Sequence, residues 1–231
     1  MQNNYQFITG KIIFAGNKKL YFYNMAKLRN IGTLTLNGGM LCFNFINTIY
    51  AWRGENLHEY LGTYDDVVAW CKKVNILTHS QRAAIAKEVK LHPAKAVAAL
   101  NQLHFTRGLL YQLFSAIAAG HQHKLPATVL APFNKALSLS YSHLAFSVKQ
   151  KKITLAWVDA DTDLLQPLWM IMKDAADILT TQNSGRIKEC PKCGWVFIDS
   201  TKNNMRRWCS PLSCGSTDKA KKYYDKIREE K

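Results

Sequence analysis

The chain has 231 residues and a formal net charge of +15, and 48% of its residues are hydrophobic. This composition excludes an intrinsically disordered chain. No stretch approaches the roughly 18 apolar residues of a membrane span, so a membrane partner is not expected. A pI near 9.6 predicts attraction to polyanions, without choosing between nucleic acid, anionic membranes and acidic proteins.

Residues 1–36 are interpreted as an N-terminal extension. Two β-like runs at 7–14 and 20–23 flank a turn at 16–19 and predict a hairpin. Met25 is an alternative start of translation. Residues 1–16 lack the apolar run of a secretory signal. A soluble, reducing, cytoplasmic setting is expected, where clustered cysteines indicate a metal more often than disulfides.

A dense apolar segment begins after Gly38-Gly39. Leu41, Phe45, Ile46 and Ile49 recur at helical spacing, which favours a helix. The polar residues here admit two interpretations, a site for a small-molecule effector or an internal hydrogen-bond network, and the network is favoured because buried amides usually bond to their neighbours. These candidate ligand-binding residues are Asn47, Thr48 and Arg53.

The region from 37 to 182 is predicted to form one mainly helical domain. Thr63 and Thr78 or Ser80 are helix N-caps, Pro93 ends one helix or starts the next, and Gly120 stops a long Ala- and Leu-rich helix. Two alternating runs around a lysine-rich turn predict a β-hairpin. The expected elements are helices beginning at 63 and 78, at 94–119 and 126–140, strands at 144–148 and 153–158, and a helix at 164–181 capped by 161–163.

Four cysteines lie within 25 residues, with the spacing C-x2-C, fifteen residues, then C-x4-C. Four thiolates at this spacing can close a tetrahedral shell around one Zn²⁺ and leave no position for a catalytic water. The prediction is therefore one structural zinc ion and no enzyme active site. The predicted ligands are Cys190, Cys193, Cys209 and Cys214.

The region 187–231 is predicted to be a small zinc module that follows a linker at 182–185. Gly194 permits a tight turn after the second cysteine, 195–198 form a strand, and 217–229 form a basic helix. Residues 186–231 hold 12 Lys and Arg against 6 Asp and Glu, and the rest of the chain holds 19 against 10. Per residue the tail is more than twice as basic. The expected fold class is mostly α with a small β-hairpin component, a helical domain followed by a treble-clef-like module.

Three short motifs in the tail resemble the CGNR zinc-finger family. They are the strand 195–199 of the type W-x-F-x-D, the run Arg206-Arg207-Trp208-Cys209-Ser210, and the pair Cys214-Gly215. The stretch 41–48, with Arg53, resembles the start of the ABATE-type domain that usually precedes this finger. The two resemblances cover roughly 37–231 and imply a stress-linked bacterial transcription regulator whose finger binds DNA.

The sequence departs from the family pattern at two places. Ser216 and Thr217 occupy the positions of the family's Asn and Arg, and Asn44 replaces an Asp. If the family arginine contacts DNA, this chain lacks that contact. Nearby lysines can restore attraction to phosphates but not bidentate reading of a base.

Two function hypotheses follow. The first is a zinc-containing DNA-binding regulator whose N-terminal domain senses a ligand or mediates homodimerisation. The second is a structural zinc module whose basic face binds RNA or a protein, and an enzyme with a pocket in the N-terminal domain is a weaker third. The candidate nucleic-acid contacts are Arg206, Arg207, Lys219, Lys221, Lys222 and Lys226.

Overall fold

A computed structural model describes residues 29–53, 58–149, 151–158 and 162–229. The hairpin predicted within 1–36 falls on residues 1–28, outside the described residues. The side chains at positions 149, 221, 222, 224 and 229 are also outside the description. The described part is mostly helical and carries two separate two-stranded antiparallel sheets, which confirms the predicted fold class.

The apolar segment after the glycine pair forms only a short helix, α1 (Leu41–Ile46). The predicted continuation to Ile49 is wrong, because the chain leaves the helix at Asn47 and Ile49 forms an isolated β-bridge with Glu59. No side chain of its own caps α1. Instead, the carboxylate of Asp174 accepts a hydrogen bond from the Cys42 N–H at 2.7 Å. Burial raises the pKa of Asp174.

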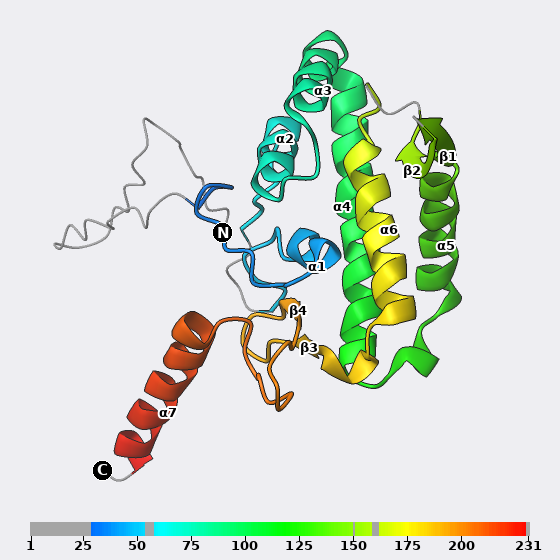
Figure 1. Cartoon of the computed structure of the whole chain (residues 1–231). Coiled ribbons are helices and arrows are strands. Elements are labelled where there is room, and N and C mark those ends of the chain that lie inside the picture. The colour runs from blue at the N-terminus through cyan, green and yellow to red at the C-terminus, as the bar shows by residue number, and fades with distance from the viewer. Residues whose placement is uncertain (1–28, 54–57, 150, 159–161, 230–231) are drawn as a thin grey trace, which may run out of the picture.

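The next three helices begin where their caps predict. Thr63 and Thr78 each form a capping box, with Asp66 and Gln81 respectively, at the starts of α2 (Tyr64–Lys73) and α3 (His79–Leu91). Pro93 is the first residue of α4 (Pro93–Ala118), where its missing N–H costs nothing. The helix α4 packs against α1, α2, α3 and α5 and against both strands of the zinc module (Figure 1).

The middle of the chain supplies α5 (Ala127–Tyr141), the hairpin β1 (Leu144–Lys149) and β2 (Lys152–Trp157), and α6 (Gln166–Thr181). The predicted hairpin is confirmed. The predicted start of α6 at 164 is two residues early. Asp163 accepts a hydrogen bond from the Leu165 N–H at 2.7 Å and holds a turn before the helix, and Asp161 is outside the described residues.

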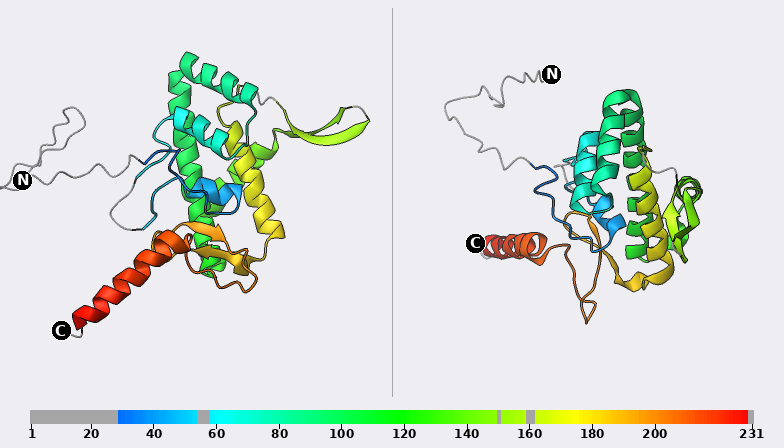
Figure 2. Two further views of the ribbon diagram at one scale, coloured as in Figure 1. Left: turned by 60° about the vertical axis from the view of Figure 1, so that its left-hand side comes forward. Right: turned by 45° about the horizontal axis from the view of Figure 1, so that its top comes forward.

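The zinc module contains one strand that the pattern did not predict. The predicted linker 182–185 runs into a 3-10 turn (Ser184–Arg186). The strand β3 (Ile187–Glu189) follows and pairs with β4 (Val196–Ile198). The strand β4 therefore pairs with the segment before the first cysteine, and the return segment 206–209 is not a strand. A π-helical turn (Pro211–Gly215) leads into α7 (Ser216–Glu229), which projects from the body (Figures 1 and 2).

One continuous core joins the helical domain and the zinc module. Its buried members include Phe43 in α1, Phe114 in α4, Met172 in α6 and Phe197 in β4. Phe43 and Phe114 meet edge to face with ring centroids 4.9 Å apart. The strand β4 belongs to this core and also pairs with β3, so it is held by the helical domain and by its own sheet.

Among the described helices, none has the length and apolarity to cross a bilayer.

Candidate metal centre

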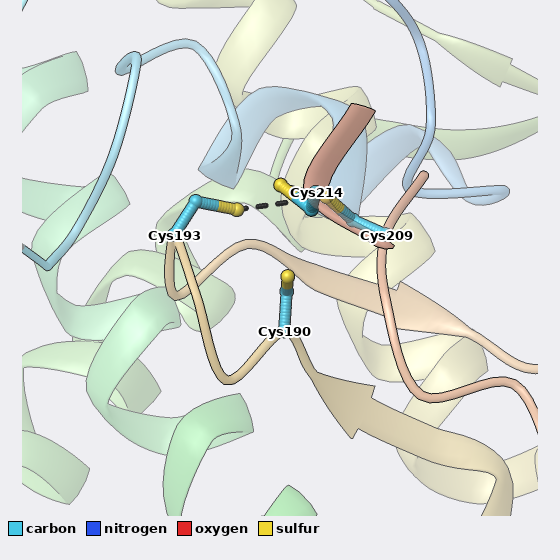
Figure 3. Close-up of side chains that lie close together, drawn as sticks. All are labelled: Cys190, Cys193, Cys209 and Cys214. Atoms are coloured by element: carbon cyan, nitrogen blue, oxygen red, sulfur yellow. Dashed lines mark hydrogen bonds between the residues drawn. The ribbon is translucent and has the colours of Figure 1, made fainter. Parts of the chain in front are cut away.

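The four predicted ligands converge on one point. Their sulfur atoms all lie within 4.8 Å of one another, although two come from the turn after β3 and two from the segment before α7 (Figure 3). The Cys193 and Cys209 sulfurs are 3.5 Å apart, and those of Cys209 and Cys214 are 3.7 Å apart. Cys190 and Cys209 are buried, while Cys193 and Cys214 are partly exposed.

These separations fit tetrahedral zinc. With Zn–S bonds of about 2.3 Å, a tetrahedral shell places sulfurs about 3.8 Å apart. The Cys193–Cys209 and Cys209–Cys214 sulfur separations are within about 0.3 Å of that value. Among the described residues, no other three side chains of His, Cys, Asp or Glu lie close enough together to hold one metal ion. The donor set is four thiolates, so the site suits a soft, closed structural zinc and offers no open position for a substrate.

The crowded thiols do not ionise independently. Hydrogen bonds from the Cys193 and Cys209 thiols lower the pKa of Cys190 well below its usual range. The same contacts with Cys190 raise the pKa of both Cys193 and Cys209. Binding a metal displaces the protons that remain, so metal affinity is expected to rise with pH.

Gly194 lets the turn at residues 190–194, here called the knuckle turn, pack against the helical domain. It has φ +76°, which confirms the predicted left-handed turn. An added Cβ would also lie 2.8 Å from Cβ of Trp52 and 3.2 Å from the Tyr111 hydroxyl. Trp52 stacks on Tyr111 at 3.9 Å and donates its backbone N–H to the Cys193 carbonyl at 2.7 Å. Only glycine therefore combines the turn with this close contact.

Arg53 binds beside the same turn. Its guanidinium pairs with Glu189, the residue before the first ligand, and donates to the Pro191 carbonyl at 3.5 Å. Glu189 also accepts hydrogen bonds from Tyr111 and Ser115 of α4. Arg53 thus joins the helical domain to the base of the zinc module.

Asn47 and Thr48 form the internal network that the sequence favoured. The Asn47 side chain donates to the Val196 carbonyl at 2.8 Å and accepts from the Val196 N–H at 3.0 Å. Asn47 therefore mimics a neighbouring strand at β4. Thr48 is fully buried, donates to the Phe45 carbonyl and accepts from Arg107. An effector site at Asn47, Thr48 and Arg53 remains a prediction.

Replacing Asn47 by Ala is expected to destabilise the protein by about 2–3 kcal/mol. The change leaves the N–H and C=O of Val196 buried without partners, and each such group costs about 1–3 kcal/mol. Urea unfolding with zinc in excess would measure the loss. Asn37→Ala is the matched control, because the Asn37 amide bonds only to exposed Thr35 in the described contacts. A loss below about 0.5 kcal/mol, the usual range for surface changes, would contradict the strand-mimic role.

Asp199 and Arg206 organise the return of the chain to the metal. The buried carboxylate of Asp199 accepts hydrogen bonds from the Thr201 N–H and hydroxyl and from the Arg206 N–H. Burial alone would raise the pKa of Asp199, but these hydrogen bonds outweigh it and lower the pKa. The Arg206 guanidinium donates to the carbonyls of Trp208, Cys209 and Asn37 and lies 4.4 Å from the Phe197 ring centroid. Much of its hydrogen-bonding capacity is used inside the protein.

Arg207 faces solvent, unlike its neighbour. Its guanidinium carbon lies 5.2 Å from the centroid of the Trp208 ring, and the residue is exposed. Lys219 and Lys226 are exposed on α7, whereas the side chains of Lys221 and Lys222 are outside the description. The structure therefore separates the predicted contacts into Arg206, which holds the fold, and exposed cations on the return segment and on α7.

Ser216 and Thr217, which replace the family's Asn and Arg, have a local structural role. The Ser216 hydroxyl donates to the Leu212 carbonyl at 2.7 Å, and the Thr217 hydroxyl donates to the Ser213 carbonyl at 2.7 Å. Both side chains thereby bond back to the π-helical turn that carries Cys214. They occupy the start of α7 without placing a cation there.

The sequence reasoning missed a buried ion pair behind the site. Arg107 of α4 is almost fully buried and pairs in a bidentate manner with Glu59. It also donates to the Thr48 hydroxyl at 2.8 Å. Burial would raise the pKa of Glu59, but the hydrogen bond and charge of Arg107 lower it overall. The sequence feature that could have indicated this ion pair is an arginine inside the apolar pattern of a long helix.

Two family models match the chain. The ABATE model, described as "Putative stress-induced transcription regulator", matches residues 39–182. The CGNR zinc finger model matches residues 186–226. The second match includes all four cysteines that converge in the structure. A search of curated proteins finds no match.

Proposed function

The chain belongs to the ABATE family of transcription regulators and carries a CGNR zinc finger, and from this premise we propose that it is a zinc-containing regulator that binds DNA. One structural Zn²⁺ on the four cysteines fixes the pose of the basic return segment and α7. The helical domain serves ligand sensing or oligomerisation, and the protein acts in the cytoplasm. One observation carries the proposal. Arg207 is exposed two residues before the metal ligand Cys209, and the segment that holds Cys209 and Cys214 continues into the projecting helix α7.

The zinc has a structural role in this proposal. Four thiolates fill the shell, so the ion has no position at which to activate water or polarise a substrate. Cys190 and Cys193 lie on the turn after β3, and Cys209 and Cys214 lie on the segment before α7. Cys193 and Cys209 are 16 residues apart, so the ion ties that turn to the start of α7. The proposal accordingly assigns no enzymatic activity to the site.

The DNA contact is proposed to use charge and shape more than base reading. Arg207, Lys219, Lys226 and Arg228 are exposed, and Lys and Arg side chains at such a surface attract phosphates. Ser216 and Thr217 bond to the preceding turn and leave no arginine at the family position. Affinity should therefore depend strongly on salt, with a log–log slope of about −0.9 for each phosphate contacted.

Two adjacent arginines provide a matched test. Arg207→Ala is expected to lower DNA affinity and to reduce the salt slope by about one, with zinc content unchanged. Arg206→Ala removes hydrogen bonds to the carbonyls of Trp208 and Cys209, and such support of a metal site typically changes metal affinity by about 10–100-fold. Fluorescence anisotropy with duplex DNA and a zinc competition assay measure the two effects. An unchanged salt dependence of DNA affinity in Arg207→Ala would show that Arg207 does not contact a phosphate.

The second candidate function is RNA or protein binding by the same basic surface. It is favoured by the absence of an arginine at the family position after Cys214-Gly215, which weakens sequence-specific reading of DNA. Parallel titrations with duplex DNA, single-stranded RNA and double-stranded RNA separate the candidates. Preference for RNA at every salt concentration would favour the second, and no binding to any of them at low salt would exclude DNA and RNA together.

A further inference from the structure

The hairpin strands β1 and β2, residues 144–149 and 152–157, stand away from the helical body (Figure 2). We call this hairpin the arm. Its register places Phe146 opposite Leu155 and Val148 opposite Ile153, so these four side chains share one face. The exposed fractions are 77% for Phe146, 72% for Val148, 72% for Ile153 and 48% for Leu155.

The other face of the arm is small and polar. Ser147 lies opposite Thr154, and their hydroxyls are hydrogen-bonded at 3.0 Å. An isolated two-stranded hairpin is marginally stable in water, because it has no surface on which to bury its apolar face. An arm with this alternation is therefore suited to packing on another apolar surface.

A second unfilled apolar surface lies beside the base of the arm. A groove of about 1110 Å³ is formed by residues of α3, α4, α5 and α6 and of the turn before α6. Trp169 of α6 lines the groove. Its ring centroid is 6.1 Å from that of Trp157 at the end of β2. The charged residues of the groove are balanced, and most of the lining is apolar. The lining includes Ala99, Phe105, Ala131, Leu139, Leu165 and Trp169.

We propose that a second copy of this chain fills the groove with its arm, so that two copies exchange arms reciprocally across a two-fold axis. In such an interface the same two surfaces meet twice, arm in groove and groove around arm. The apolar face of the arm matches the apolar lining of the groove, and the register puts Lys152 on the opposite face of the arm. This inference concerns self-association and is independent of the proposed DNA binding.

The buried area distinguishes arm exchange from simple contact between two arms. Burying a large apolar side chain removes on the order of 100 Å² from water, so the exposed parts of the four side chains offer about 270 Å² per arm. Two arms packed face to face would bury about 540 Å², which is typical of non-specific contacts. Two arms in two grooves would bury about 1,100 Å², because the grooves contribute equally, and this exceeds the roughly 1,000 Å² of a specific interface.

The first test is the mass of the zinc-loaded full chain in solution. Sedimentation equilibrium from about 1 to 100 µM should show a dimer that dissociates on dilution, as expected for a micromolar Kd. Because each copy carries a net charge of +15, added salt should strengthen the dimer by screening repulsion, while it weakens DNA binding. A monomer at every concentration and salt would overturn the proposal, and would leave the groove to a small apolar ligand.

Three variants test which surfaces meet. Phe146→Asp on the arm and Leu139→Asp in the groove should each weaken dimerisation by about tenfold or more, because each introduces a charge into the apolar contact. Ser147→Asp, on the opposite face of the arm, is the control and should leave the dimer intact. Circular dichroism and zinc content should be unchanged in all three. A dimer unaffected by Leu139→Asp would overturn arm exchange and favour direct contact between arms.

Mixing two variants gives the sharpest outcome. Phe146→Asp retains an intact groove, and Leu139→Asp retains an intact arm. Arm exchange predicts that the mixture forms a heterodimer through one intact contact and therefore associates more strongly than either variant alone, because a homodimer of either variant carries the charge in both contacts. Sedimentation of a mixture with one fluorescently labelled variant detects this species. A mixture that associates no more strongly than either variant alone, over the same concentration range, would overturn the proposal.

Discussion

Replacing Cys209 by Ser is expected to reduce bound zinc from one ion per chain to nearly none. Cys209 contributes the sulfur that lies 3.5 Å from Cys193 and 3.7 Å from Cys214, so its loss opens the shell between the two halves of the site. Structural zinc contributes about 10–16 kcal/mol to the folding of comparable peptides. A loss of this size exceeds what a module of one small sheet and one helix can recover by packing.

The measurement should follow both the metal and the fold. Elemental analysis gives zinc per chain, and hydrogen exchange should show lost protection at the amides of β4 and of the first turn of α7. Protection of Val196 is the most informative, because its N–H is bonded to Asn47 of the helical domain. Cys71→Ala is the control, since Cys71 is a buried thiol in α2 outside the cluster. Full zinc content in Cys209→Ser would contradict the four-thiolate site.

Replacing Arg107 by Met is expected to destabilise the folded chain by about 3 kcal/mol, at the low end of the 3–5 kcal/mol for breaking a buried pair, because Glu59 is partly exposed. The change also removes the donor to the buried Thr48 hydroxyl. Urea unfolding measures the loss, and Lys173→Met is the control because its helical pair with Asp177 is partly exposed and worth a few tenths of a kcal/mol. A loss equal to that of the control would show that the ion pair adds no stability.

The same pair predicts a dependence on pH. Arg107 lowers the pKa of Glu59 in the folded chain from its ordinary value near 4.5. The resulting stability is complete above that value and is lost as the pH falls through the lower, folded pKa. Arg107→Met should therefore lose less stability than the unmodified chain on acidification below pH 4.5. The double variant Arg107→Met with Glu59→Leu should recover part of the loss, because no charge then stays buried alone.

Local chemistry made the helix starts predictable. Thr63 and Thr78 form the capping boxes that their sequences indicate, and Pro93 occupies the first turn of α4. The start of α1 was not predictable in the same way, because its cap comes from Asp174, 132 residues later in the chain. The end of α1 also depends on a distant partner, since Asn47 turns away to bond Val196.

The pairing of β4 required the tertiary structure as well. A run of three residues, Val196–Ile198, indicates a strand but not its neighbour. Three residues at Ile187–Glu189 carry too little pattern to identify β3, and the helical domain adds further bonds to β4 from Gly38 and Asn47. The other neighbours of β4 therefore come from a segment about 150 residues earlier in the chain, and the pattern of a short strand does not indicate them.

The spacing of the four cysteines by itself determined the candidate metal, its ligands and its closed geometry, because four thiolates around one small ion allow few other arrangements. The sequence also determined that the tail is basic. Only the tertiary structure decided which cations are available to a partner. Arg206 and Arg207 are adjacent and chemically identical, yet Arg206 bonds to the carbonyls of Trp208 and Cys209, while Arg207 faces solvent. That difference arises from the direction of each side chain once the chain is folded around Asp199 and the cysteines, and composition and spacing do not encode it.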